Sequence, residues 1–347
     1  MPPTLLIRIM IDLIRITFKK SAGLILCDQV FFYMTSIQQP IHSHFNANST
    51  AAEIAAGHDL KGKTILVTGG NSGIGYETVK ALASAGARVV ATGRDAHKAN
   101  DRLSALPNVS FMPLDLADPL SVDTFAEQFL AAYPDLHLLI NNAGIFRPPQ
   151  LQKDQRGYEL QFGVNHLGHF QLTGRLWPAL RNAGGARVVV LSSVGHRRSE
   201  LELDDLQSKH HPYDSAKAYG LSKTANVLFT VELDRIGSPH GIRAFAVHPG
   251  AVHTDIFRYM TDDERQIWDL QIAHFKSQEQ GAATTVWCAL SDQLNDIGGV
   301  YCEDCNIAPI VPNDAPPGRG VRGFALDPRT AGELWQFSEA ATGISWP

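Results

Sequence analysis

The sequence predicts an α/β fold in which one parallel sheet is covered by helices on both faces, and two observations carry this prediction. From Lys63 onward, short apolar segments alternate with segments of helical periodicity. The apolar segments lack polar alternation, so they suit parallel strands that are buried on both sides. The turn after the first segment is rich in glycine and leads directly into a helix, which is typical of a doubly wound sheet.

Seven strands are expected along the chain. The first is Thr64 to Thr68, and the helix after it spans Ile74 to Ala85. The other six are Arg88 to Thr92, Val109 to Leu114, Leu138 to Asn141, Arg187 to Ser192, Ile242 to His248 and Gly299 to Cys302. Strand–helix–strand connections of this length form right-handed crossovers. The site of such a sheet lies at the carboxyl ends of its strands.

The composition excludes several classes of protein. The chain has 347 residues, of which 44% are hydrophobic and 19% charged, so it can bury a large core and is not a disordered chain. Its 30 basic and 35 acidic residues give a formal net charge of −5. Nucleic acid is therefore not an expected partner, because proteins that bind phosphate backbones are usually basic. Four cysteines are too few for a disulfide scaffold, and a reducing, cytoplasmic compartment fits better.

The chain is expected to form one catalytic domain over residues 46–305, with a lid over residues 255–280. Aromatic side chains in that lid, with Phe146 on the facing wall, would favour a lipophilic or aromatic substrate. Packing of the same aromatic residues within the fold is the alternative. Residues 306–347 are expected to form a proline-rich surface loop and then a helix from Asp327 to Ala340 that packs on the same domain.

Residues 1–45 form an amphipathic or apolar N-terminal extension. Leu5 to Phe18 is apolar but is interrupted by Arg8, Asp12 and Arg15, so it is no clean membrane span. Three interpretations remain open. Residues 1–34 could contact a membrane surface, they could form an extra packed helix, or they could have little role, with the working chain starting near Met34.

The glycine-rich turn indicates a nucleotide cofactor. It reads Thr-Gly-Gly-Asn-Ser-Gly-Ile-Gly over residues 68–75, at the start of a helix whose free N–H groups and dipole favour a pyrophosphate. The spacing is not G-x-G-x-x-G, and Tyr76 stands where a Walker loop needs lysine. A tight strand–helix connection without a nucleotide is the alternative. The candidate cofactor-binding residues of this turn are Gly69, Asn71, Ser72, Gly73, Ile74 and Gly75.

The end of the second strand favours NADP(H) over NAD(H). A carboxylate at this position would bind a ribose 2′-hydroxyl, whereas this chain has Gly93 followed by Arg94. The Arg94 guanidinium can bind a 2′-phosphate. The alternative is that Arg94 is a solvated arginine at the start of a helix.

Tyr219 and Lys223 are the first candidates for catalysis. They are four residues apart, so they share one face of a helix, where a lysine ammonium favours the phenolate of a tyrosine. Ser193 follows the fifth strand, which places its hydroxyl at the same edge of the sheet. Ser193 is not in a G-x-S-x-G turn, so a hydrolase nucleophile is not expected.

Taken together, these motifs resemble the short-chain dehydrogenase/reductase family over roughly residues 60–302. The resemblance is carried by the glycine turn, Asp115, Asn141-Asn142-Ala143-Gly144, Asn165, Ser193, Tyr219-x-x-x-Lys223 and Pro249-Gly250. Within that family the chain is most similar to the retinol dehydrogenase and WW-domain oxidoreductase group, although it has no WW domain. Residues 164–170, Val-Asn-His-Leu-Gly-His-Phe, and residues 50–53, Thr-Ala-Ala-Glu, carry that part of the resemblance.

The resemblance implies a role for each of four catalytic residues. Tyr219 would exchange a proton with the substrate oxygen, and Ser193 would hold that oxygen. Lys223 would shift the tyrosine and bind the nicotinamide ribose, and Asn165 would hold a water in a proton relay. Besides Tyr219 and Lys223, the resemblance adds these residues to the cofactor-binding set: Asp115, Leu116, Asn142, Ala143, Gly144, Pro249, Gly250, Val252 and Thr254.

The resulting hypothesis is a single Rossmann-like domain that uses NADP(H) to interconvert an alcohol and a carbonyl on a lipophilic small molecule. Two alternatives stay open, a double-bond reductase on the same scaffold and a non-catalytic NADP(H)-sensing protein. No metal site is expected, since His166 and His169 lack a third ligand nearby. A homodimer through the helices that carry Asn165 and Tyr219 is a further expectation from the resemblance.

Overall fold

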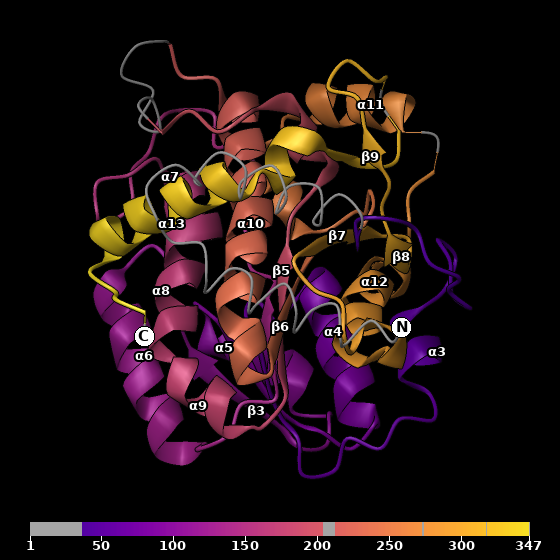
Figure 1. Cartoon of the computed structure of the whole chain (residues 1–347), viewed down its shortest axis with the longest axis vertical. Helices are drawn as coiled ribbons and strands as arrows, with labels where there is room; N and C mark the ends of the chain where they lie inside the picture. The colour runs from indigo at the N-terminus through magenta and orange to yellow at the C-terminus, as the bar shows by residue number, and fades with distance from the viewer. Residues whose placement is uncertain (1–36, 204–211, 273, 317, 347) are drawn as a thin grey trace, which may run out of the picture.

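A computed structural model describes residues 37–203, 212–272, 274–316 and 318–346. Its centre is an eight-stranded sheet with the order β3-β2-β1-β4-β5-β6-β7-β8 (Figure 1). The order reverses between β1 and β4, which is the switch point of a doubly wound sheet. The proposed membrane contact by residues 1–34 lies outside the described residues. Within the described residues, no helix combines the length and apolar character needed to cross a membrane.

The seven expected parallel strands are confirmed, with bounds shifted by at most one residue at either end. The strands are β1 (Thr64–Val67), β2 (Arg88–Gly93), β3 (Val109–Pro113), β4 (Leu138–Asn141), β5 (Ala186–Leu191), β6 (Ile242–His248) and β7 (Val300–Glu303). The sequence analysis did not predict the eighth strand, β8 (Asn306–Ile307), which pairs antiparallel with β7.

Successive residues of the inner strands face opposite helical layers, as expected for a sheet that is buried on both sides. Ile65 and Val67 pack with α3, α4, α5 and α12, while Leu66 packs with α6, α8, α9 and α10. The helices of the two layers are α3 (Ala51–Ala55), α4 (Gly73–Ser84), α5 (Ala96–Leu103), α12 (Gln278–Leu290), α6 (Pro119–Ala132), α8 (Gly168–Arg175), α9 (Trp177–Asn182) and α10 (Ser215–Gly237).

The remaining elements lie mainly in the connections at the carboxyl edge and near the chain ends. They are α7 (Leu160–Phe162), η1 (Gly163–Leu167), η2 (Val194–Arg198), η4 (Ser238–His240), η5 (Asp255–Tyr259), α11 (Asp262–Gln271), η6 (Asp292–Leu294), β9 (Ile310–Val311), β10 (Val321–Arg322), η7 (Gly323–Leu326) and α13 (Pro328–Thr342). The expected loop over residues 306–320 therefore includes the short strands β8 and β9. Each is held by pairing with a distant partner, β8 with β7 and β9 with β10.

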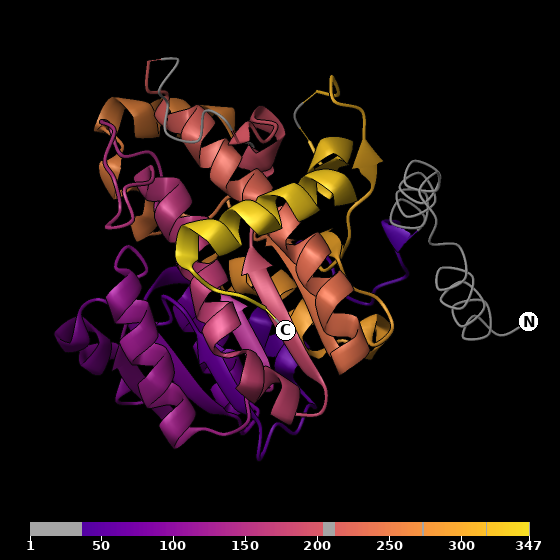
Figure 2. The same cartoon turned by 60° about the vertical axis from the view of Figure 1, so that its left-hand side comes forward.

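Helix α13 lies across α10 and beside α8, where Figure 2 shows it in yellow. The Trp335 ring lies 5.0 Å from the Phe170 ring of α8 and 5.8 Å from the Phe229 ring of α10, measured between centroids. The outer faces of α8 and α10 are therefore covered by the chain itself. The resemblance predicts a homodimer through these same regions. Helix α10 carries Tyr219, and α8 directly follows the turn that carries Asn165.

Residues 37–45, which the sequence analysis assigns to the N-terminal extension, lie against the edge of the sheet. The buried Gln38 side chain bonds to the main chain of Tyr301 and Ala308 at 2.7–2.9 Å. The Ile41 backbone exchanges two hydrogen bonds of 2.9 Å with the Asn306 side chain. The segment thus covers backbone groups at an edge that would otherwise be open.

Candidate active site

The glycine turn at the end of β1 has the geometry of a phosphate-binding turn. Gly69 and Gly73 have φ values of 64° and 54°, in the left-handed region that favours glycine. A Cβ atom on Gly75 would collide with the Gly69 carbonyl oxygen, so the helix can approach the turn only without a side chain there. Ser72 at the N-cap of α4 makes no side-chain cap bond, and the first turn holds no acidic residue. An anionic group therefore fits at this helix end.

Three other strand ends converge on this turn. A Cβ atom built on Gly93, at the end of β2, would lie 2.8 Å from the Asn71 amide oxygen. A Cβ atom built on Gly73 would lie 3.1 Å from the Thr254 methyl carbon, beyond β6. Ala143, beyond β4, makes the same close approach to Gly69. The structure therefore brings together predicted cofactor residues from three separate segments, and it places Gly93, the neighbour of Arg94, beside them.

Thr68 ties the loop after β4 to the end of β1. Its hydroxyl accepts hydrogen bonds from the backbone N–H groups of Asn142 at 2.9 Å and Ala143 at 3.0 Å. The Asn142 side chain donates to the Thr68 carbonyl at 2.7 Å. Three hydrogen bonds thus hold the two loops in one arrangement, and two of them end on the same oxygen atom.

Asn165 lies in η1, a π-helical turn between α7 and α8. Such wide turns occur often at functional sites, because they change the direction of a side chain on an otherwise regular helix. The buried Asn165 side chain exchanges hydrogen bonds with the Ile145 backbone at 2.9 and 3.1 Å and donates to the Ser222 hydroxyl at 3.0 Å. A Cβ atom on Gly144 would lie 3.2 Å from the Asn165 oxygen and 3.6 Å from the Lys223 nitrogen.

Tyr219, Ser193 and Lys223 meet at the carboxyl edge of the sheet. A Cβ atom on Gly195 would lie 2.9 Å from the Tyr219 ring and 3.4 Å from the Ser193 hydroxyl, so these two groups lie side by side. The Lys223 nitrogen lies 5.7 Å from the centre of the Tyr219 ring and donates to the Leu191 carbonyl at 2.9 Å. Ser193 and Tyr219 therefore both lie against Gly195, and the Lys223 nitrogen lies near the Tyr219 ring.

Burial dominates the acid–base properties of this pair. Burial raises the pKa of Tyr219 to about 12, with a hydrogen bond from Ser193 acting in the opposite direction. Burial also lowers the pKa of Lys223 to about 7. The sequence analysis expects a lysine ammonium to favour the phenolate, and burial of the phenol acts in the opposite direction.

The other predicted cofactor residues have different surroundings. One Asp115 carboxylate oxygen accepts from the Ala117 N–H group at 2.9 Å, and Leu116 is buried with its backbone against Gly168 of α8. Val252 and Ile74 pack their side chains against Gly281 of α12, so any contact with a cofactor would come from their backbones.

Pro249 and Gly250 directly follow β6, and Gly250 has a φ of 92°. Arg94 is exposed at the end of β2. The glycine cradle, the uncapped helix end and this exposed cation together fit an anionic dinucleotide.

An aromatic cluster adjoins Tyr219. The Phe146 ring meets the Tyr219 ring edge to face, with 4.6 Å between centroids. On its other side Phe146 contacts Phe257 of η5 at 5.4 Å and Trp268 of α11 at 6.1 Å, and these two rings lie 4.4 Å apart. The Arg147 guanidinium also reaches Glu264 of α11, at 3.5 Å. The segment predicted as a lid therefore contacts the wall that holds Phe146.

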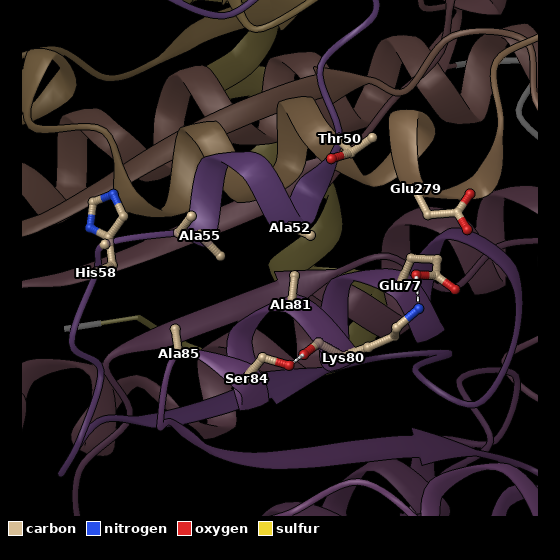
Figure 3. Close-up of a pocket in the computed structure, with 12 residues that line it drawn as sticks. Thr50, Ala52, Ala55, His58, Glu77, Lys80, Ala81, Ser84, Ala85 and Glu279 are labelled. Carbon is tan, nitrogen blue, oxygen red and sulfur yellow. Dashed lines mark hydrogen bonds and ion pairs between the residues drawn. The ribbon is translucent and has the colours of Figure 1, made fainter.

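A second hollow lies away from these residues, between α3, α4 and the start of α12 (Figure 3). Small side chains such as Ala52, Ala55 and Ala81 line it, with an ion pair of 3.1 Å between Lys80 and Glu77 at its rim. It contains none of the predicted catalytic or cofactor residues. Among the described residues, no group of three or more His, Cys, Asp or Glu side chains could hold a metal ion.

The sequence analysis missed several residues that shape this site. Ile145, Leu191 and Ser222 bond to the predicted catalytic side chains through backbone or hydroxyl groups. The sequence contains no signal for such contacts, since most residue types could supply them. His169 was considered as part of the segment that carries the resemblance and as a metal ligand, but not for its contacts with Asn165 and Thr68.

Comparisons with known proteins agree with this geometry. The profile of the short chain dehydrogenase family matches residues 63–265. Retinol dehydrogenase 12 of Mus musculus is 41% identical over 83% of this chain and 88% of its own length. The WW domain-containing oxidoreductase of Gallus gallus is 40% identical over 77% of this chain and 67% of its own length.

Solved structures show the same fold. A putative uncharacterized protein from Mycobacterium paratuberculosis has a TM-score of 0.67 and 32% identity, over 86% of this chain and 99% of that one. The Pseudomonas aeruginosa RhlG/NADP active-site complex has a TM-score of 0.59 and 26% identity, over 71% and 95%. With the convergence of the glycine turn, Asn165, Ser193, Tyr219 and Lys223 at one sheet edge, these matches show that the chain belongs to the short chain dehydrogenase family and is an NAD(P)-dependent oxidoreductase.

Proposed function

We propose that this enzyme uses NADP(H) to interconvert an alcohol and a carbonyl on a lipophilic small molecule, with Tyr219 as the proton donor and acceptor. The proposal depends chiefly on one observation. The Tyr219 ring lies beside the Ser193 hydroxyl on one side and near the Lys223 nitrogen on the other, at the carboxyl edge of the sheet. The nicotinamide, when bound, supplies or accepts the hydride.

The residues of this chain would handle the proton and the substrate oxygen. Tyr219 would give its proton to the carbonyl oxygen during reduction and take it back during oxidation. Ser193 would donate a hydrogen bond to the same oxygen. Lys223, whose pKa is lowered to about 7 by burial, can exchange a proton close to neutral pH.

Asn165 restricts how a proton relay could be built. Both hydrogens of its amide are already donated, to Ile145 and Ser222. Its oxygen accepts one bond from the Ile145 N–H group and has a second lone pair. A relay water held by the Asn165 side chain would therefore have to donate to that oxygen atom.

The aromatic cluster supports a lipophilic substrate. Phe146, Phe257 and Trp268 place apolar surface next to Tyr219, whereas a polar substrate would call for hydrogen-bonding side chains there. Two of the similar proteins are named retinol dehydrogenases, and retinol is a lipophilic alcohol. The preference for NADP(H) is supported by Arg94, at the strand end where Gly93 leaves no carboxylate for a ribose hydroxyl.

Turnover of NADPH and NADH against a panel of apolar aldehydes and ketones tests this proposal. Tyr219→Phe should lower kcat by about 10²–10⁴-fold, since that is the usual contribution of a positioned acid–base group. Tyr133→Phe is the matched control, because the Tyr133 hydroxyl contacts Ser110 of β3, which is not among the predicted site residues. Unchanged turnover in Tyr219→Phe would contradict the assigned proton donor. Binding of NADPH without any carbonyl turnover would contradict the alcohol–carbonyl reaction.

A further inference from the structure

His169 lies between two parts of the site. One is the loop that is predicted to bind the cofactor, and the other is the turn that carries Asn165. It lies in the first turn of α8 and is 1% exposed. Its Nδ1 atom is 3.0 Å from the Asn165 carbonyl oxygen, and its Nε2 atom is 2.9 Å from the Thr68 hydroxyl oxygen. Thr68 is 101 residues away in sequence and ends the first strand of the sheet.

The partners of His169 determine which of its nitrogens carries the proton. The Asn165 carbonyl oxygen can only accept, so Nδ1 must donate. In a neutral imidazole Nε2 is then an acceptor, and the Thr68 hydroxyl must donate to it. This agrees with the other contacts of Thr68, whose oxygen already accepts the backbone N–H groups of Asn142 and Ala143. The Thr68 hydroxyl also lies 3.4 Å from the Ile140 carbonyl oxygen, but its contact with Nε2 is shorter, at 2.9 Å.

The surroundings of His169 keep its ring neutral. Burial lowers the pKa of His169 to about 4, and the nearby Lys223 acts in the same direction. The hydrogen bond to the Asn165 carbonyl acts in the opposite direction but does not outweigh burial. At neutral pH the ring can therefore donate at one nitrogen and accept at the other, as the arrangement requires.

A side chain that bonded to only one of these two partners would hold only one of the two loops. We propose that His169 is a positioning residue that couples the cofactor-binding loop at Asn142–Ala143 to the π-helical turn that holds Asn165. This proposal rests on the proposed function, since it assigns the two ends of the link to cofactor binding and to proton transfer. Through Thr68, the order that a cofactor imposes on the loop would pass to the Asn165 backbone.

His166 offers a comparison within the same segment. It is equally buried, but its Nε2 atom bonds to the Ser338 hydroxyl of α13 at 2.8 Å, on the side away from the cofactor residues. Replacing His166 removes a buried imidazole without touching Thr68 or the Asn165 carbonyl. It is therefore a control for the loss of packing alone.

Three substitutions separate the two hydrogen bonds. The amide of His169→Asn can replace Nδ1 and keep the bond to the Asn165 carbonyl, while the longer His169→Gln can replace Nε2 and keep the bond to Thr68. His169→Leu removes both. We expect His169→Asn to weaken NADPH binding about tenfold with a smaller change in kcat, and His169→Gln to lower kcat about tenfold with near-normal NADPH binding. His169→Leu should show both losses.

NADPH affinity is measured by titration of nicotinamide fluorescence, and kcat by turnover of an apolar aldehyde. His166→Gln should show neither loss. Equal losses in His169→Asn, His169→Gln and His166→Gln would overturn the proposal, because they would mark a packing role only. Wild-type affinity and kcat in His169→Leu would also overturn it.

The tautomer provides a test that needs no activity. Nitrogen-15 spectra of the histidine side chains in the wild-type protein should show a neutral His169 with its proton on Nδ1, the signal being assigned by its loss in His169→Asn. A proton on Nε2, or a charged ring at neutral pH, would overturn the proposal. If the wild-type enzyme reduces no carbonyl, the proposed function fails, whereas the tautomer and the NADPH affinities still decide the role of His169.

Discussion

Tyr219 and Lys223 show how an enclosed site changes the acid–base properties of single residues. A tyrosine with a pKa of about 12 holds its proton at neutral pH, and a lysine with a pKa of about 7 is only partly charged. An added negative charge near Lys223 would favour the ammonium form and so reduce the cost of the phenolate.

Arg94 provides a test of cofactor preference at the scale of one residue. Arg94→Ala should weaken NADPH binding by about tenfold or more and leave NADH binding nearly unchanged. A hydrogen bond to a charged group contributes about 1.5–3 kcal/mol, and about 1.4 kcal/mol corresponds to tenfold in affinity. The measurement is a titration with each cofactor, and Arg102→Ala, an exposed arginine of α5, is the control. Equal losses for the two cofactors would contradict a role in 2′-phosphate binding.

At the scale of elements, we propose that α11 and η5 form a lid that decides which substrates reach Tyr219. Their aromatic residues contact Phe146, which itself contacts Tyr219. The same segment is tied to the wall by the pair between Arg147 and Glu264. The side chains of both arginine and glutamate in this pair are partly exposed, so the pair contributes little to stability, on the order of 0–1 kcal/mol. The aromatic contacts are therefore the stronger link.

Trp268 provides the test of the lid. Trp268→Ala should raise the KM for a long aldehyde such as decanal about tenfold and leave the KM for propanal almost unchanged, because lost apolar contact costs about 25 cal/mol per Å² and a short substrate does not reach the indole. Leu270→Ala on the same helix is the control, since Leu270 is 88% exposed. A KM that stays the same for every apolar substrate would contradict the lid.

On the scale of the whole molecule, four histidines with lowered pKa values make stability depend on pH. Burial lowers the pKa values of His166 and His248 to about 3, and those of His169 and His196 to about 4. Below about pH 6.5 the unfolded chain takes up protons that the folded chain does not. Stability is therefore fully present above about pH 6.5 and is lost as the pH falls towards about 4.

Denaturant unfolding between about pH 7.5 and about pH 5 tests this expectation. Well below pH 6.5, each histidine should reduce the free energy of unfolding by about 1.4 kcal/mol per pH unit. His166→Gln should show a smaller slope, because it removes one of the four groups. A free energy of unfolding that does not change over this range would contradict the neutral, buried state of these side chains.

Much of the fold follows from local sequence. The segments Leu138–Asn141 and Ile242–His248 are mostly apolar and of strand length, and the structure has strands with those same bounds. Such runs can be recognised in the sequence, because a strand that is buried on both faces has few positions where a polar side chain could reach water. The two-residue strands β8, β9 and β10 have no such signature, and each exists only through its pairing with a partner elsewhere.

The sequence by itself determined the fold class, the family and the residue types that carry the chemistry, because glycine turns, strand patterns and the Tyr-x-x-x-Lys spacing are local. Only the tertiary structure decided the environment of those residues. Burial sets the pKa values of Tyr219 and Lys223, α13 covers the outer faces of α8 and α10, and His169 meets Thr68 across 101 residues. Desolvation and hydrogen bonding depend on which distant segments pack together, and no local pattern records that.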